Sequence, residues 1–148
     1  MKLLDCHNAI KQVKSNYQTA LQTVNVLIGI VVELPQLLYN HNLDLTEMRS
    51  LALNLHDVYF VRMFASFESS LRHYWRTKLR DTKPLTQQIL SSLAGRFGVP
   101  QDTLDIVQEI REFRNYLIHE EHEIKKRFTI EEASKHLNTF LARLPIEW

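Results

Sequence analysis

Glycine, proline and cysteine are all scarce in this chain of 148 residues. It contains three glycines, four prolines and one cysteine. So few turn-forming residues favour long helices over many short strands joined by tight turns. The single cysteine, Cys6, excludes an intramolecular disulfide and fits a reducing cytosol. We therefore expect an all-α protein with a cytoplasmic location.

The sequence also lacks a long apolar run and a strong excess of charge of one sign. Its most apolar window, residues 24–32, contains Asn25 and is too short to cross a bilayer. No signal peptide is evident after Met1. The formal net charge is +1, so any attraction to nucleic acid must be local. We expect a protein that does not contact a membrane.

Several common catalytic arrangements are missing. Ser69 and Ser70 have no flanking glycines of the kind that form a nucleophile turn, and no glycine-rich loop could bind a nucleotide phosphate. Residues 119–123 place histidines and glutamates at turn spacing, which could suit zinc or manganese. The spacing is not His-Glu-x-x-His, however, and a solvated helix end explains it more simply. We expect neither a metal nor another cofactor.

Helical periodicity is the main positive signal, and it extends along a single domain, residues 1–148. Small or apolar residues recur at alternating steps of three and four from Leu3 to Leu38. This seam predicts a long N-terminal helix within residues 1–40, which Pro35 should end or kink. A coiled-coil dimerisation helix and an intrachain helical hairpin both have such a seam.

The rest of the fold is expected in a core of residues 44–144. Asp44 has capping-box spacing and should begin a second long helix that runs to about Leu79, antiparallel to the first. Gly98 should end the next helix. Three shorter helices are expected, over residues 85–97, from Asp102 or Thr103 into the charged run 120–127, and from Thr129 to Pro145. The prediction is an elongated bundle of about five helices.

Polar side chains that could carry chemistry cluster in the segment Arg114–His119. The core-facing stripe of its helix is expected to consist of Ile106, Ile110, Phe113 and Leu117. Asn115 and His119 are four residues apart and share the outward face, while Arg114 lies near the edge of the stripe. Such a cluster could bind a ligand or simply be a wet surface.

Glu68 is the most informative residue outside that segment. It lies at the margin of an aromatic stripe within residues 64–71, where a carboxylate is costly unless it is paired. Arg114 is a natural partner on the other helix, and Arg72, one turn further along, is the alternative. We predict that these two helices pack together and that Glu68 holds Arg114.

The run Arg114-Asn115-Tyr116-Leu117-Ile118-His119 resembles the signature of HEPN domains. In that signature an Arg is followed at once by a polar residue such as Asn and, four to six residues later, by His. Residues 64–71 are similar to the Phe-x-x-Phe-Glu-x-x-Leu helix of many members. The resemblance covers roughly residues 44–144 and leaves residues 1–40 unexplained. It implies a small helical bundle with a long antiparallel helix pair.

The resemblance implies a metal-independent endoribonuclease that acts as a homodimer, with two motifs meeting in one composite cleft. In this interpretation His119 transfers protons and Arg114 stabilises charge on the phosphate. Asn115 orients the imidazole or the phosphate, and Glu68 holds Arg114. The RNA products would carry 2′,3′-cyclic phosphates.

Partners are implied as well. The basic residues expected to bind the RNA substrate are Arg111, Arg72 and Arg76. The setting would be a toxin–antitoxin or phage-defence system, in which a protein partner masks the cleft. Toxins silenced by nucleotidylation carry a Tyr two residues after the His, where this chain has Glu121. The alternative is a non-catalytic HEPN-like module for dimerisation or protein binding.

Overall fold

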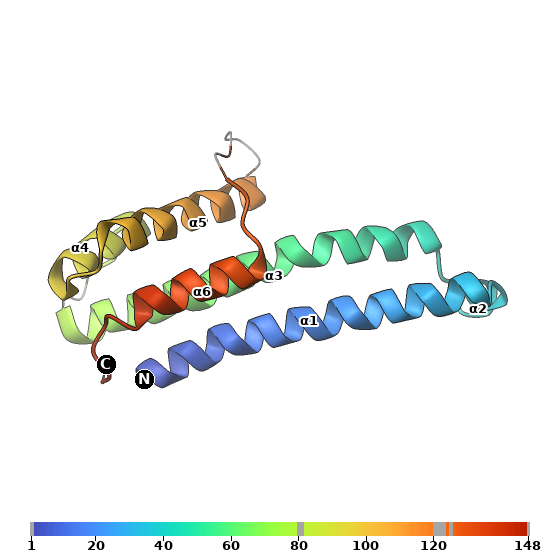
Figure 1. Ribbon diagram of the computed structural model, residues 1–148, viewed down its shortest axis with the longest axis horizontal. Helices are drawn as coiled ribbons and strands as arrows, with labels where there is room; N and C mark the ends of the chain where they lie inside the picture. Colours follow the sequence, from blue (N-terminus) through green and yellow to red (C-terminus); the bar gives the residue numbers. More distant parts are fainter. Residues whose placement is uncertain (1, 80–81, 120–123, 125, 148) are drawn as a thin grey trace.

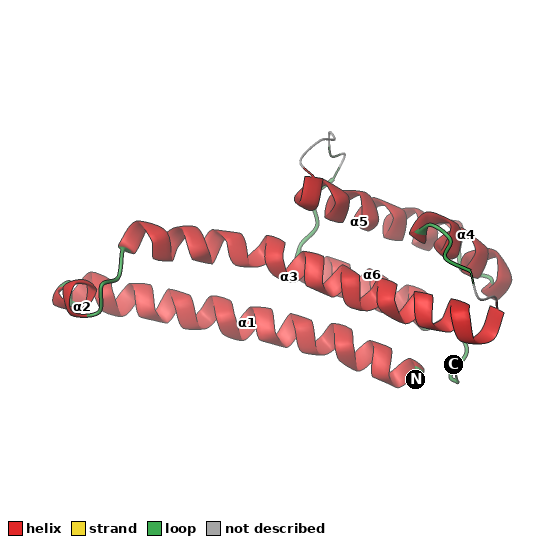
Figure 2. Cartoon of the chain, turned by 180° about the vertical axis from the view of Figure 1, so that it is seen from behind, coloured by secondary structure: helices red, strands yellow, loops and turns green. Residues whose placement is uncertain are grey.

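The computed structural model describes residues 2–79, 82–119, 124 and 126–147, and in these ranges the chain is helical (Figures 1 and 2). The elements are α1 (Leu3–Glu33), α2 (Gln36–Asn40), α3 (Leu45–Tyr74), the π-helical turn η1 (Trp75–Leu79), α4 (Thr86–Phe97), α5 (Gln101–His119) and α6 (Ile130–Leu141). No β-strand occurs in the described ranges, where an isolated bridge pairs Lys2 with Glu147. The all-α prediction is confirmed. The described ranges contain six α-helices rather than about five, because the short α2 is separate from α1.

The two long helices α1 and α3 lie side by side and antiparallel (Figure 1). Helix α6 packs against both of them over one half of their length, and α4 and α5 cover the same half of α3. The other half, residues 18–55, projects beyond the remaining helices and is called the arm below (Figure 2). The seam of α1 therefore forms an intrachain hairpin.

Local signals in the sequence set most helix ends where they were predicted. Helix α1 ends at Glu33, shortly before Pro35. The side chain of Asp44 accepts a hydrogen bond from the backbone N–H of Glu47 at 2.9 Å and caps α3. Gly98 follows α4 with a φ of +62°, a left-handed conformation that strains other residues.

The start of α5 was predicted wrongly. The helix begins at Gln101, so Asp102 and Thr103 lie in its first turn rather than at its cap. Pro100 takes the position before the helix, and its carbonyl accepts the N–H of Leu104 at 3.0 Å. Proline suits this position because its fixed φ is already helical and no N–H is needed there.

A cluster of aromatic side chains fixes α5 and α6 onto α3. Phe60 and Phe113 are almost fully buried, with ring centroids 4.8 Å apart in an edge-on arrangement. Phe67 and Phe140 make a similar contact at 5.8 Å. Such pairs each contribute about 0.5–1.5 kcal/mol beyond their buried area. They place the middle of α3 directly beneath the segment Arg114–His119.

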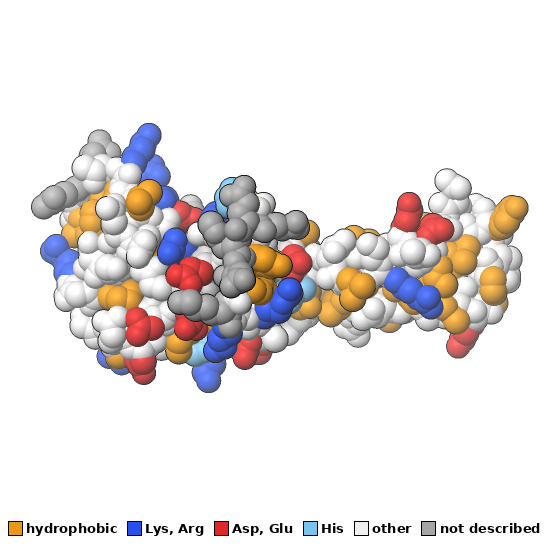
Figure 3. All heavy atoms as spheres, turned by 90° about the horizontal axis from the view of Figure 1, so that it is seen from above, with side chains coloured by type: hydrophobic (Ala, Val, Ile, Leu, Met, Phe, Trp, Pro, Cys, Tyr) orange, Lys and Arg blue, Asp and Glu red, His pale blue; other side chains and the backbone are white. Residues whose placement is uncertain are grey.

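The arm is much less buried than the rest of the molecule. The predicted seam is buried at Cys6, Ile10, Val13 and, within the arm, Val31, but Leu27 and Leu34 are 39% and 46% exposed. The seam was therefore predicted wrongly at those two positions, which lie in the half of the hairpin that α6 does not cover. Figure 3 shows the arm as a narrow extension with apolar side chains open at its surface. No helix in the described ranges is both long enough and apolar enough for a bilayer span.

Candidate functional site

Helix α5 presents Arg114 toward α3 rather than toward solvent. Its fully buried residues are Val107, Ile110 and Phe113, whereas Ile106 and Leu117 are only half-buried. The buried stripe of α5 is therefore rotated slightly about the helix axis from the stripe that the sequence predicted. Arg114 lies four residues after Ile110 and seven after Val107, so it continues the buried face.

Glu68 contacts both of the arginines that the sequence suggested as partners. Its Oε1 accepts hydrogen bonds from Arg72 Nη2 at 2.8 Å and from Arg72 Nε at 3.1 Å. Its Oε2 lies 3.5 Å from Arg114 Nη2, an ion pair that joins α3 to α5. The predicted packing of these two helices is confirmed. Arg72 is the closer partner, since it belongs to the same helix one turn further along.

The first residue of α4 and a residue of the loop before it complete this polar cluster. The hydroxyl of Thr86 donates to Glu68 Oε1 and accepts from Arg72 Nη2 at 2.9 Å. The carbonyl of Pro84 accepts from Arg72 Nη1 at 3.0 Å. Sequence reasoning missed both residues, because neither Thr86 nor a loop carbonyl has a spacing that relates it to Glu68. The cluster thereby joins three helices, α3, α4 and α5.

The Glu68 carboxyl is held in its ionised form. Burial acts to raise its pKa, but hydrogen bonds from Thr86 and Arg72, with the charges of Arg72 and Arg114, outweigh burial and leave the pKa below the ordinary value. A carboxylate that stays charged at neutral pH is suited to anchoring a guanidinium and poorly suited to donating a proton.

Arg114 has two further contacts besides its ion pair with Glu68. Its Nη1 donates to the side-chain oxygen of Asn115 at 2.9 Å, and its guanidinium carbon lies 5.7 Å from the centroid of the Phe64 ring. Its Nε is buried and has no hydrogen-bond partner among the described residues. The side chain is nevertheless 25% exposed, so part of the guanidinium reaches the surface.

His119 lies apart from this cluster, at the end of α5. It is exposed, and no hydrogen bond or ion pair joins it to another described residue. Asn115 bonds to Arg114 rather than to His119. The structure therefore brings Arg114, Asn115, Glu68 and Arg72 together, and leaves His119 exposed on the same helix, without a polar contact to any described residue.

The other residues expected to contact RNA differ in their surroundings. Arg111 Nε donates to Gln108 within α5 at 2.9 Å. Arg76 is exposed on η1 and lines a cavity together with Arg72. The acidic run Glu120, Glu121 and Glu123 lies outside the described residues. So does His122, and the possible metal cluster of residues 119–123 therefore falls almost wholly outside them.

The cluster carries an excess of positive charge, because one carboxylate, Glu68, faces two guanidiniums, Arg72 and Arg114. A partly exposed guanidinium with unused N–H groups is suited to binding a phosphate. No protein-family model, curated protein or solved structure matches the chain. The function is therefore argued from these residues and their geometry.

Proposed function

We propose that the protein is a metal-independent endoribonuclease of the HEPN type that acts as a homodimer. The observation that carries the proposal is the division of α5 between a fixed guanidinium and an exposed imidazole. Arg114 is held by Glu68 and Asn115, and His119 is exposed five residues further along. These are the two kinds of group that RNA cleavage without a metal uses.

The reaction follows from the chemistry of these groups. An imidazole takes the proton from a ribose 2′-OH, the 2′-oxygen attacks the adjacent phosphorus, and the bond from phosphorus to the 5′-oxygen breaks. A second imidazole, protonated, donates a proton to the leaving 5′-oxygen. Arg114 stabilises the negative charge that develops on the phosphate. The products are a 2′,3′-cyclic phosphate and a 5′-hydroxyl.

A homodimer fits the need for two imidazoles. The segment Arg114–His119 supplies one histidine, whereas the reaction uses one base and one acid. Two copies of the segment facing one another would supply both groups, and two guanidiniums as well. The exposed position of His119 at the end of α5 leaves it accessible to such a second copy.

The biological setting that we propose is a microbial toxin–antitoxin or phage-defence system in the cytoplasm. A nuclease with no metal requirement needs another means of control, and a protein partner that covers the cleft would provide one. The single cysteine, Cys6, is consistent with a reducing compartment. Silencing by nucleotidylation is not part of the proposal, because Glu121 occupies the position of the modified Tyr.

The arm favours a second candidate function, a non-catalytic module for dimerisation or protein binding. It exposes several large apolar side chains, among them Val26 at 56%, Ile30 at 43% and Leu53 at 79%. Apolar side chains that gather on one surface are typical of protein contacts. Such a module would bind a partner without cleaving RNA.

Cleavage of RNA in EDTA distinguishes the two functions. The purified protein is incubated with an RNA and with the same sequence carrying 2′-deoxyribose throughout. We expect cleavage of the RNA alone, with 2′,3′-cyclic phosphate ends that a phosphatase removes only after acid opening of the ring. Cleavage of the 2′-deoxy strand would contradict the proposed chemistry. A folded dimer that cleaves neither strand would favour the binding module.

A further inference from the structure

Positive charge in this chain is concentrated in one region. Residues 69–101, called the basic segment below, contain six Lys or Arg residues and a single acidic residue, Asp81. The rest of the chain carries a net formal charge of −4, within a total of +1. The net charge of the whole chain is too small to attract nucleic acid, but the positive charge of the basic segment can do so locally.

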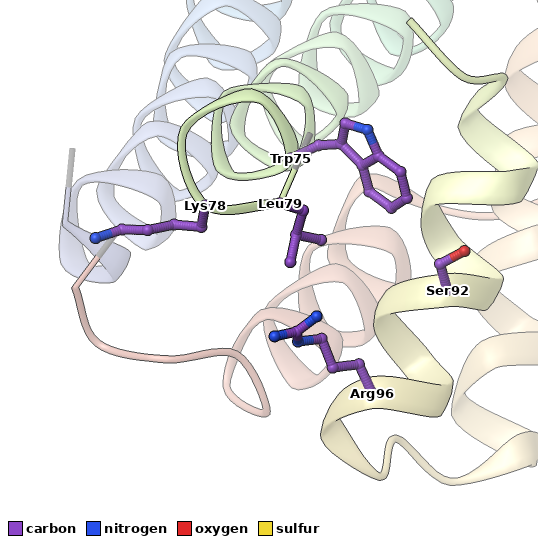
Figure 4. Close-up of a pocket in the computed structure, with 5 residues that line it drawn as sticks. All are labelled: Trp75, Lys78, Leu79, Ser92 and Arg96. Carbon is purple, nitrogen blue, oxygen red and sulfur yellow. The ribbon is translucent and has the colours of Figure 1, made fainter. Parts of the chain in front are cut away.

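Two elements of the basic segment, η1 and α4, border a cleft. Its lining residues are Trp75, Lys78, Leu79, Ser92 and Arg96, and its volume is about 480 Å³ (Figure 4). The indole of Trp75 stands on the η1 side, opposite Ser92, and Arg96 reaches up from α4. Among the described residues, the lining combines an aromatic ring with two cations and includes no carboxylate, which suits a base joined to phosphate.

A second cavity, of about 220 Å³, also has Trp75 in its lining. Arg72, Arg76 and Lys83 line it. Arg72 also binds Glu68, which pairs with Arg114. Arg72 therefore connects the second cavity to the ion pair of Arg114 through the carboxylate of Glu68.

The cations of the cleft are available for a ligand. Lys78, Arg76, Lys83 and Arg96 are exposed, and no carboxylate of the described residues lies within 4.0 Å of any of them. The outer face of α5 is different, because Asp102, Asp105 and Glu112 are exposed there. An RNA strand is therefore attracted to η1 and α4 rather than to the exposed acidic residues of α5.

The π-helical turn shapes the cleft. The Thr77 hydroxyl donates to the backbone carbonyls of His73 at 2.9 Å and Tyr74 at 3.3 Å, where the helix widens. Trp75 begins this turn and is fixed by a hydrogen bond from its Nε1 to Thr82 Oγ1 at 3.0 Å. Single π turns within helices occur frequently at functional sites.

We infer that the Trp75 cleft is a second binding subsite for single-stranded RNA, distinct from the Arg114–His119 segment. One base stacks on the Trp75 indole, and neighbouring phosphates contact Arg96, Lys78 and Arg76. The inference rests on the proposed function for the identity of the ligand. The subsite holds the substrate strand at a point away from the bond that is cleaved.

Quenching of Trp75 fluorescence tests the subsite without any cleavage. The chain has two tryptophans, so Trp148→Phe leaves Trp75 as the sole reporter. The probe is a 2′-O-methyl oligouridylate of about 12 nucleotides, within the usual range of single-strand site sizes. We expect saturable quenching by this strand, and none by an abasic strand of equal length, because quenching requires a stacked base.

Charge removal then locates the phosphates. Lys78→Gln and Arg96→Gln should each weaken binding and reduce the slope of log affinity against log salt concentration by about 0.7. The matched control is Lys135→Gln, an exposed lysine on α6 outside the basic segment, which should change neither quantity. Equal effects from all three variants would overturn the subsite.

The test separates this inference from the proposed function. Quenching by the uncleavable strand in a protein that never cuts RNA would support the subsite and contradict the nuclease. Cleavage that is unchanged in Lys78→Gln and Arg96→Gln, with no quenching, would support the nuclease and overturn the subsite. Binding of polyglutamate to the cleft in preference to the RNA strand would also overturn it, in favour of an acidic protein partner.

Discussion

The two ends of the segment Arg114–His119 differ in how tightly the rest of the protein holds them. Arg114 is joined to α3 through Glu68 and to its neighbour Asn115, and it lies over the ring of Phe64. His119, at the other end, is exposed at the end of α5 and has no polar partner among the described residues. One helix thus carries a fixed cation and an exposed imidazole.

This difference suggests a division of roles. A guanidinium that must stabilise a developing charge benefits from being fixed in advance, because no energy is then lost in reorienting it. An imidazole that accepts and donates a proton has to meet solvent or substrate. Changes at Arg114 should therefore affect both stability and activity, whereas changes at His119 should affect activity alone.

Arg114→Ala should have the largest combined effect. It removes the ion pair to Glu68 and the contact with Phe64, so we expect a loss of about 1–2 kcal/mol in the free energy of unfolding. RNA cleavage should fall at least about 100-fold, since one stabilising donor is worth that much. Urea denaturation and cleavage assays at a temperature where both proteins are folded measure the two losses separately.

Arg114→Lys is the matched control for that variant. Lysine keeps the positive charge but lacks the planar fork that spans Glu68 and Asn115. It should recover part of the stability and little of the activity. Full activity in Arg114→Lys would mean that charge alone suffices and that the fixed geometry of the guanidinium is unimportant.

Glu68→Gln should mainly reduce stability, by about 1–3 kcal/mol, because two guanidiniums lose their shared carboxylate. The pKa of Glu68 is lowered in the folded protein, so its contribution is fully present above the ordinary glutamate value and is lost as the pH falls through the folded pKa. The difference in stability between wild type and Glu68→Gln should therefore be constant near neutrality and shrink below about pH 4.3. Thermal melts from pH 7 downward, at about one-unit steps, measure it. A difference that grows on acidification would contradict the assignment.

Arg111→Ala should have the smallest effect. Among the described residues, the side chain of Arg111 bonds only to Gln108 within its own helix, and it lies beside the acidic outer face of α5. We expect a change in stability within about 0.5 kcal/mol and less than about a threefold change in RNA affinity. A fluorescence anisotropy titration checks the affinity, and a loss comparable to that of Arg96→Gln would place the RNA along α5 instead.

Much of the fold could be predicted because its signals are local. Pro35, Asp44 and Gly98 act through the backbone of their own neighbourhoods, and each ends or begins a helix as expected. The seam of α1 was predicted less well, because its periodicity does not reveal how far α6 extends. Leu27 has the same spacing as Ile10 but no helix above it.

The candidate site could be predicted only in part. Glu68 and Arg114 each lie at the margin of the apolar stripe of their helix. These positions indicated that the two residues pair, since a carboxylate beside aromatic rings needs a cation. Thr86 and the Pro84 carbonyl could not be found, because a loop brings them to Arg72 and loops leave no periodic pattern. The sequence does not fix where Asn115 points, since an amide on a helix can reach several neighbours.

Cleavage by His119→Ala is the most direct test of the central claim, that a free imidazole on α5 transfers the proton. Wild type, His119→Ala and His41→Ala are compared in EDTA on one RNA, alongside thermal melts of each. His41 is an exposed histidine at the tip of the arm and is the matched control. We predict a loss of at least about 100-fold for His119→Ala with its melting temperature unchanged, and full activity for His41→Ala. Cleavage by His119→Ala at the wild-type rate would contradict the claim.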